Sequence, residues 1–389
     1  METIERMDSN GLIHDMERLK ELRALSLDQK IGISIARIIE WYQYYNGNVY
    51  IAFSGGKDST VLLHLVRSVF PDVPAVFVNT GLEFPEVVNF VKTQENVIIL
   101  RPEINFKKVL IDYGYPLISK EVAKKIRTAR RITYFEDKKI PKAVRLHLMG
   151  KHPDHGISNM TDEEIINNKD HSSAYNSKKY LPIAEELPVL ISEQCCNIMK
   201  KNPSKVFEKE KHVVPYIGTL VEESRLRQKT WLANGCNAFF VDRPKSTPLS
   251  FWTEQDILTY IKYNNLEIAS CYGEIEEIKS NSCSENCKYR CSLEQRTGCT
   301  FCSFGQHLEK ENKYQHLAKT HPQIYDFCMR GGQWIDNPKY DGNAPTGPDK
   351  FGWVNWNPKK IWVPSKEGLG FKKVFDMANE LVPGYIKYE

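Results

Sequence analysis

Residues 54–59, with the sequence Ser-Gly-Gly-Lys-Asp-Ser, constrain the fold more than any other part of the chain. Residues 49–53 before them are apolar and rich in β-formers, and residues 60–69 after them carry apolar side chains at helical spacing. Two glycines let a backbone turn tightly and approach an anion, and the first N–H groups of a helix face negative charge. The spacing differs from that of a Walker A loop. The pattern predicts a phosphate-binding loop between a strand and a helix; the alternative is a tight turn that binds nothing.

The flanking sequence predicts an α/β fold with a doubly wound parallel sheet. Residues 1–47 form a helical lead-in with a capping box at Ser26 and Gln29. Strands and helices then alternate at intervals that are typical of parallel sheets. The predicted strands are 49–53, 74–78, 97–100, 212–217 and 238–241, and the predicted helices between or after them are 60–69, 85–92, 222–234 and one after Ser250.

Composition sets the class of protein. The chain has 389 residues, of which 41% are hydrophobic and 26% charged, and this excludes wholesale disorder. No apolar run approaches the ~20 residues that a membrane-spanning helix needs. The first residues are too charged for a signal peptide. We therefore expect a cytoplasmic protein with no membrane partner.

Three further segments give the chain a family resemblance. The loop resembles the PP-loop of the adenine nucleotide α-hydrolases, and residues 76–91 (VFVNTGLEFPEVVNFV) resemble the phosphoadenosine phosphosulfate (PAPS) reductase branch of that superfamily. Residues 218–227 are similar to the branch's Glu-Ser-x-x-Arg region, and residues 245–257 to its Pro-Leu-x-x-Trp-Thr segment. The resemblance covers about residues 45–330 and is interrupted by an insertion.

The resemblance implies an adenine nucleotide, ATP or PAPS, across the carboxyl ends of the strands. The residues implied to surround it are Ser54, Gly55, Gly56, Lys57, Asp58, Ser59, Asn79, Thr80 and Gly81. An intact Lys-Asp in the loop resembles the members that use ATP with Mg²⁺. The predicted catalytic residues are Lys57, Asp58, Arg225 and Arg227. Guanidinium groups match phosphate and sulfate oxygens, although each arginine can equally be a surface residue of a helix.

The cysteines predict metal ligation. Cys195-Cys196 and the pair Cys299 and Cys302 resemble the ligands that adenylyl-sulfate reductases use for a [4Fe–4S] cluster; zinc and structural thiols are the alternatives. A second metal site is predicted, as an alternative to a persulfide-carrying or resolving thiol, from residues four apart on an expected helix, with Cys271 or His307 as a fourth ligand. Its three residues are Cys283, Cys287 and Cys291. Cys236 and Cys328 are predicted to be core residues.

The function that follows is an enzyme of the PAPS reductase family acting in sulfur chemistry, either phosphosulfate reduction or sulfur transfer, with an electron or sulfur donor protein as partner. The chain carries no Glu-Cys-Gly-Leu/Ile-His segment after Cys328, unlike the phosphosulfate reductases. The alternatives are an ATP-dependent sulfurtransferase that thiolates a nucleic acid, of the tRNA thiolation or DNA phosphorothioation type, and a non-catalytic nucleotide sensor that binds nucleic acid.

Residues 101–145 are the basis for a nucleic-acid partner. They hold thirteen Lys or Arg and five Asp or Glu, so their net charge is +8, while the rest of the chain carries −4. Such a block favours a polyanion, and a solvated helical face explains it equally well.

Four regions are predicted in all: the lead-in 1–47; a PP-loop domain 48–270, with a basic and polar insertion at about 118–211; a Cys-rich metal lobe 271–330; and a Trp-rich C-terminal extension 331–389.

Overall fold

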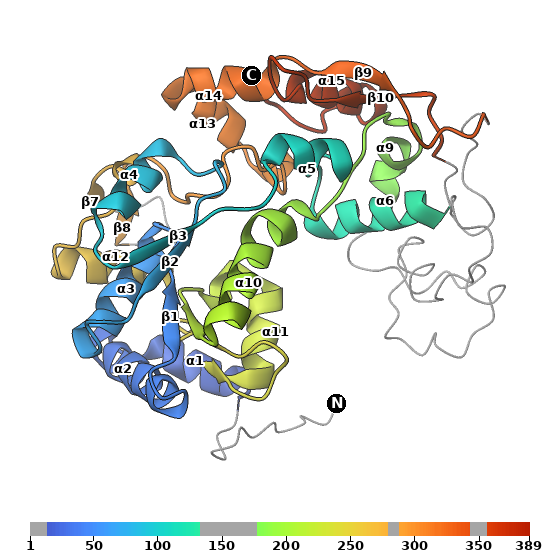
Figure 1. Cartoon of the computed structure of the whole chain (residues 1–389). Coiled ribbons are helices and arrows are strands. Elements are labelled where there is room, and N and C mark those ends of the chain that lie inside the picture. Colours follow the sequence, from blue (N-terminus) through green and yellow to red (C-terminus); the bar gives the residue numbers. More distant parts are fainter. Residues whose placement is uncertain (1–13, 133–176, 279–287, 343–355) are drawn as a thin grey trace. The chain divides into compact units, whose positions relative to one another are not determined.

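The computed structural model describes residues 14–132, 177–278, 288–342 and 356–389 (Figure 1). Contacts between residues divide the chain into two compact units, each made of two separate stretches. The first unit comprises Met1–Glu103 and Lys200–Cys299, and the second comprises Ile104–Met199 and Thr300–Glu389. The boundaries of the four regions predicted from the sequence thus remain a prediction. The two units differ from these regions in kind, because each unit combines stretches that lie far apart in the chain.

The first unit is built on a six-stranded sheet in the order β3-β2-β1-β4-β6-β5. Its strands are β1 (Val49–Ala52), β2 (Ala75–Val78), β3 (Val97–Leu100), β4 (Val214–Ile217), β5 (Asn237–Ala238) and β6 (Lys245–Ser246). All neighbours pair in parallel except β5 and β6, which are antiparallel. The predicted α/β fold with a mostly parallel sheet is confirmed. The strand predicted at 238–241 is wrong in extent, because β5 ends at Ala238 and Phe240 is 75% exposed.

The helices of this unit begin where the sequence carries caps. Ser26 and Gln29 form the predicted capping box of α2, and Pro85 occupies the first turn of α4. The helices are α1 (Met16–Ala24), α2 (Leu27–Tyr44), α3 (Lys57–Val69), α4 (Pro85–Thr93), α10 (Asn202–Lys211), α11 (Arg225–Asn234) and α12 (Glu254–Tyr263). A short antiparallel pair, β7 (Ile275–Glu277) and β8 (Tyr289–Cys291), completes the unit.

Helices cover both faces of the sheet. Tyr216 of β4 donates to the Ile38 carbonyl of α2 at 2.7 Å, and Tyr50 of β1 packs on Phe207 of α10 with ring centroids 5.4 Å apart. Figure 1 shows α2 and α3 on one side of β1 and α10 on the other. The chain runs outward from β1 to β2 and β3, then returns to place β4 on the other side of β1. Ligands of doubly wound sheets bind at such a switch point, beyond the carboxyl ends of the strands.

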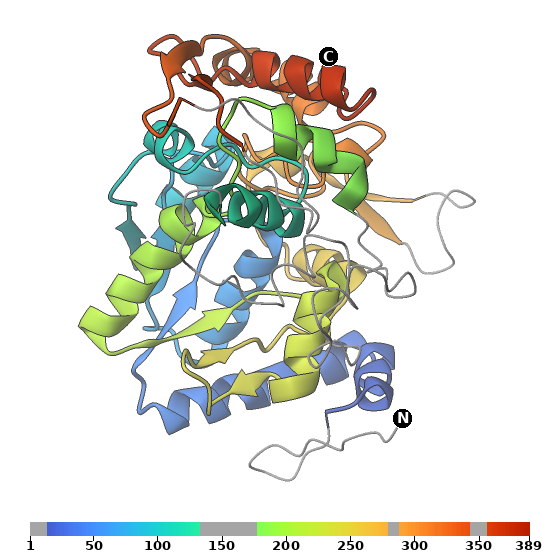
Figure 2. The same cartoon turned by 90° about the vertical axis from the view of Figure 1, so that its right-hand side faces the viewer.

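The second unit is mainly helical (Figure 2). Its helices are α5 (Phe106–Asp112), α6 (Lys120–Ile132), α9 (Leu181–Glu186), α13 (Lys313–Thr320), α14 (Pro322–Met329) and α15 (Phe371–Leu381), and its hairpin pairs β9 (Gln333–Asp336) with β10 (Lys360–Val363). Buried hydroxyls join its two stretches. The Tyr115 hydroxyl donates to the Leu369 carbonyl at 2.7 Å, and the Tyr385 hydroxyl accepts from the Ile118 amide at 2.9 Å. The described part of the predicted insertion and the C-terminal extension therefore share one core. Across the described residues, no helix has the length and apolar character that a membrane span requires.

Candidate functional site

The predicted loop joins β1 to α3, and two serines close it. Ser59 donates from Oγ to the Gly56 carbonyl at 2.8 Å and accepts from the Ser54 amide at 3.2 Å. The two serine hydroxyls are 3.0 Å apart. Gly56 is the N-cap of α3 and offers no side chain to cap it, so amides of the first turn need acceptors from outside the helix.

Close packing explains the first glycine. Gly55 has a φ of +70°, which L side chains rarely adopt, and a Cβ there would lie 2.7 Å from methyl groups of Val87 and Val91 on α4. A Cβ on Gly218, directly after β4, would lie 3.0 Å from the Asp58 carbonyl oxygen. The loop is therefore wedged between α4 and the end of β4.

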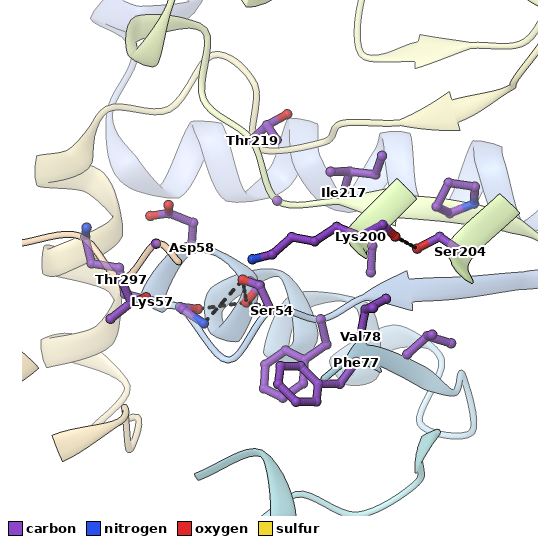
Figure 3. A pocket seen from close by; sticks show the side chains of 18 of the residues that line it. Ser54, Lys57, Asp58, Phe77, Val78, Lys200, Ser204, Ile217, Thr219 and Thr297 are labelled. Atoms are coloured by element: carbon purple, nitrogen blue, oxygen red, sulfur yellow. Dashed lines mark hydrogen bonds between the residues drawn. The ribbon is translucent and has the colours of Figure 1, made fainter. Parts of the chain in front are cut away.

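A pocket of about 730 Å³ opens beside the loop (Figure 3), and all of its lining residues belong to the first unit. Its floor is the sheet face that carries Tyr50, Ala52, Val76 and Ile217. The charged residues that line it are Lys57, Asp58, Glu83, Lys200, Lys201, Glu223, Arg227, Arg243, Lys245 and Arg296. Seven cations against three acids suit an anionic ligand, and the volume is that of a small-molecule site.

Lys57 is held by the protein itself. Its side chain is 5% exposed, and Nζ lies 3.0 Å from Glu254 Oε1 and donates to the Gln295 carbonyl at 2.7 Å. Burial lowers the pKa of Lys57, but the charges of Asp58 and Glu254 outweigh it, so the pKa is raised. The ammonium stays charged, and its predicted catalytic role remains a prediction.

Asp58 carries a buried oxygen, Oδ1, that lacks a hydrogen-bond partner within the described ranges. Burial is the main cause that raises the pKa of Asp58; Lys57 opposes it and Glu254 adds to it. A buried carboxylate oxygen without a donor is well suited to a cation.

Two residues that sequence reasoning missed, Glu83 and Lys200, meet in the pocket. Glu83 accepts from the Thr80 amide at 3.0 Å and from its hydroxyl at 2.8 Å, and Lys200 Nζ lies 3.2 Å from Glu83 Oε1. Burial lowers the pKa of Lys200, but the interactions with Cys299 and Glu83 outweigh this effect, so the pKa is raised overall. Figure 3 shows the Lys200 side chain extending across the pocket toward Ser54 and Asp58.

The turn after β2 holds the Glu83 carboxylate in place through hydrogen bonds from Thr80. The Gly81 amide donates to Asn79 Oδ1 at 3.1 Å, and Thr80 is buried against Glu83. Asn79, Thr80 and Gly81, predicted to bind the nucleotide, are absent from the lining of this pocket, whereas Glu83 belongs to it. Glu83 stands within the segment that carried the family resemblance, and that position was its only signal.

The structure separates the two predicted arginines. Arg227 lines the pocket and forms an ion pair with Glu223, one turn earlier. Burial lowers the pKa of Arg227 and the Asp58 charge opposes this. Arg225 is exposed and contributes nothing to the lining.

No disulfide joins the cysteines that the structure describes. Cys236 and Cys328 are buried, which confirms the core prediction. Cys195, Cys196 and Cys302 belong to the second unit and Cys299 ends the first. Among the described residues, no three His, Cys, Asp or Glu side chains are grouped closely enough to hold a metal ion. The cluster ligands therefore remain a prediction.

The second predicted metal site changes in character. Cys291 is the last residue of strand β8 and is buried, so the helix expected there is wrong at this position. Cys283 and Cys287 lie outside the described residues. Cys271 is buried in a short 3-10 turn, and the ring of His307 packs between those of Tyr180 and Tyr385.

Cations of the basic segment 101–145 have structural partners in α6. Arg130 is 4% exposed, and its guanidinium lies 4.2 Å from the Trp356 ring centroid. It donates to the carbonyls of Ile183, Ala184, Leu187 and Val189. Arg127 makes a two-pronged pair with Glu193, and Lys125 pairs with Glu121. Residues 133–145 lie outside the described part, so the nucleic-acid partner stays a prediction.

The sheet is doubly wound, and a loop, a helix N-terminus and a cationic pocket lie at its switch point; this is the arrangement at which α/β proteins commonly bind phosphorylated ligands. The family model of the phosphoadenosine phosphosulfate reductase domain matches residues 48–125 and 138–304. This is more than half of the chain, and the protein belongs to that family.

Individual relatives match shorter stretches. A phosphoadenosine 5'-phosphosulfate reductase of Alkalilimnicola ehrlichii is 36% identical over 72 residues, 18% of this chain and 26% of that protein. Sulfate adenylyltransferase subunit 2 of Streptomyces lavendulae is 41% identical over 68 residues, 16% of this chain and 21% of the relative. An uncharacterized protein of Methanocaldococcus jannaschii is 33% identical over 109 residues, 27% of this chain and 26% of that protein. The chain thus spans about a quarter of the length of these relatives.

Among solved structures, the PAPS reductase from Candida auris in complex with phosphate aligns with a TM-score of 0.32 at 13% identity, covering 67% of this chain and 91% of that one.

Proposed function

We propose that the chain binds an adenine nucleotide, ATP or PAPS, in the pocket beside residues 54–59 and performs sulfur chemistry on it. The observation that carries this proposal is the pocket itself, which lies at the switch point and joins the loop to seven cationic side chains. Membership of the PAPS reductase domain family supports the choice of nucleotide.

The residues divide the work by their chemistry. Amides of the first turn of α3 and the guanidinium group of Arg227 bind phosphate or sulfate oxygens, because a planar fork matches these groups. Lys200 brings a positive charge into the same space. The buried Oδ1 of Asp58 fits an Mg²⁺ ion, which would neutralise charge on a pyrophosphate if ATP is the ligand.

The reaction follows one of two routes. In phosphosulfate reduction, an electron donor protein supplies two electrons, the bond between the sulfur and the phosphate oxygen breaks, and sulfite and adenosine 3',5'-bisphosphate leave. In sulfur transfer, an oxygen of the acceptor attacks the α-phosphorus of ATP and pyrophosphate leaves; sulfide-level sulfur from a donor protein then displaces AMP from the acceptor. Cys195, Cys196, Cys299 and Cys302 offer thiolates, the donors that a [4Fe–4S] cluster takes.

The test is calorimetric titration of anaerobically purified protein with ATP plus Mg²⁺, with PAPS, and with GTP as a control nucleotide. A Gly56→Val variant should lose binding. An added Cβ there would lie only 3.2–3.3 Å from three hydroxyl oxygens, and a branched side chain would fill the approach to the loop. Exchange of labelled pyrophosphate into ATP would identify the transfer route, and sulfite release from PAPS the reductive one. Equal affinities in a folded Gly56→Val variant would refute the site.

Iron and acid-labile sulfide analysis of the same preparation decides the cluster. Stoichiometric zinc without iron would replace it by a zinc site.

A further inference from the structure

The loop's amide at Lys57 is already occupied by a side chain of the protein. The Tyr272 hydroxyl accepts a hydrogen bond from the Lys57 N–H at 3.2 Å, at the start of α3. This N–H belongs to the first helical turn, whose amides have no partner within the helix and serve elsewhere as anion donors. Tyr272 is 2% exposed, so its ring is packed and its hydroxyl is held in place.

A second hydroxyl supports the first. Thr297 Oγ1 lies 2.6 Å from the Tyr272 hydroxyl, and both line the pocket. A Cβ on Gly56 would lie 3.2 Å from the Tyr272 oxygen and 3.3 Å from the Thr297 oxygen. The space directly above Gly56, where an anion would approach the backbone, therefore holds these two hydroxyl groups beside that of Ser54 from the loop itself.

The segment that carries Thr297 is fastened to the same place. We name residues 293–298 the strap. The Leu293 and Glu294 amides donate to the carbonyls of Tyr272 and Cys271 at 3.1 Å each, and the Gln295 carbonyl accepts from Lys57 Nζ. The strap thus engages both Lys57 and the tyrosine that caps its amide.

We infer that Tyr272 and the strap occupy the place of a phosphate or sulfate group, and that a nucleotide must displace the Tyr272 hydroxyl to reach the Lys57 amide. This inference rests on the proposed function. If so, Tyr272 lowers the affinity for nucleotide. Its hydrogen bond to the Lys57 amide stabilises the protein without nucleotide and must be broken when nucleotide binds. A hydroxyl that instead contacted the bound nucleotide would favour binding.

The two cases give opposite signs in a Tyr272→Phe variant. Loss of the competing hydrogen bond should tighten ATP or PAPS binding on the order of threefold to tenfold, the equivalent of one net hydrogen bond. Thr297→Val should act in the same direction and less strongly. Tyr260→Phe is the matched control, because Tyr260 is also buried in this unit but its hydroxyl lies 2.8 Å from His64 Nδ1; its affinity should equal that of the wild type.

Hydrogen exchange measured by mass spectrometry supplies a readout that does not depend on turnover. Nucleotide should slow exchange in residues 54–60 and speed it in residues 293–298, since the strap is released when the ligand enters. Unchanged or slower exchange in the strap, or an unchanged or weaker affinity of Tyr272→Phe, would overturn the inference while leaving the proposed function intact. If neither wild type nor Tyr272→Phe binds nucleotide at millimolar concentration, the proposed function itself fails, and the inference fails with it.

Discussion

Gly55 and Gly81 form a matched pair for separating the effect of backbone strain on stability from the effect of close packing. Both have left-handed backbones, with φ of +70° and +74°. An added Cβ at Gly81 meets nothing within 4 Å, whereas one at Gly55 lies 2.7 Å from Cγ1 of Val87 and from Cγ2 of Val91. Alanine at either position takes on the backbone strain, about 1–2 kcal/mol. At Gly55 it also overpacks against α4, which adds about 1–3 kcal/mol.

The expected loss in the free energy of unfolding is therefore about 1–2 kcal/mol for Gly81→Ala and about 2–5 kcal/mol for Gly55→Ala. Urea unfolding followed by circular dichroism at 222 nm measures both variants against wild type. Val87→Ala in the Gly55→Ala background should recover part of the larger loss, because it removes one of the two methyl contacts. Equal losses in the two single variants would refute the argument, since the φ angles alone would then account for the effect.

Three other expectations concern charge. Burial raises the pKa of Asp58 above its ordinary 3.8, so the folded protein binds this proton more tightly than the unfolded chain, and stability falls as pH rises from 3.8 through the raised value. Asp58→Asn should abolish that fall and weaken Mg²⁺-dependent ATP binding; unfolding and titration across that pH range check both, and an unchanged pH profile contradicts the pKa shift. Arg130→Met should lower the free energy of unfolding by about 3–5 kcal/mol, because it leaves four carbonyls without their donor. The exposed control Lys124→Gln should lower it by under about 0.5 kcal/mol. Urea unfolding measures both, and similar losses would show that the guanidinium is dispensable. Lys200→Gln should weaken ATP and PAPS binding with a smaller effect at high salt, by calorimetry, whereas an unaltered affinity would remove Lys200 from the site.

The elements around the loop were predictable because their signals are local. The capping box at Ser26, the proline that opens α4 and the glycines before α3 each act within four residues of where they stand. The strands β1 to β3 themselves follow from the same alternation of apolar runs, whereas their order in the sheet was not predicted. Local chemistry of this kind fixes where an element starts and which face it buries.

The second unit was not predictable on these terms. Its core depends on contacts such as the one from the Tyr115 hydroxyl to the Leu369 carbonyl, which joins residues 254 positions apart. Cys291 shows the same limit on a small scale. The four-residue spacing indicated a helix, but pairing with Ile275 places it in a strand. Pairing partners override the intrinsic pattern of a short segment.

The cations that line the pocket show most clearly why the site could not be predicted in full from the sequence. The densest run of cations, residues 101–145, supplies none of the cations that line the pocket in the described part of the chain. In α6, Arg130 donates its hydrogen bonds to backbone carbonyls, and Arg127 donates to a carboxylate. The cations of the pocket instead come from a strand, loops and helix ends that lie far apart in sequence, among them Lys57, Lys200, Arg227, Lys245 and Arg296. A parallel sheet brings successive strand ends to one edge, so isolated cations that follow different strands add up there. The field that a ligand meets is therefore set by topology, and a count of charges along the chain measures a different property.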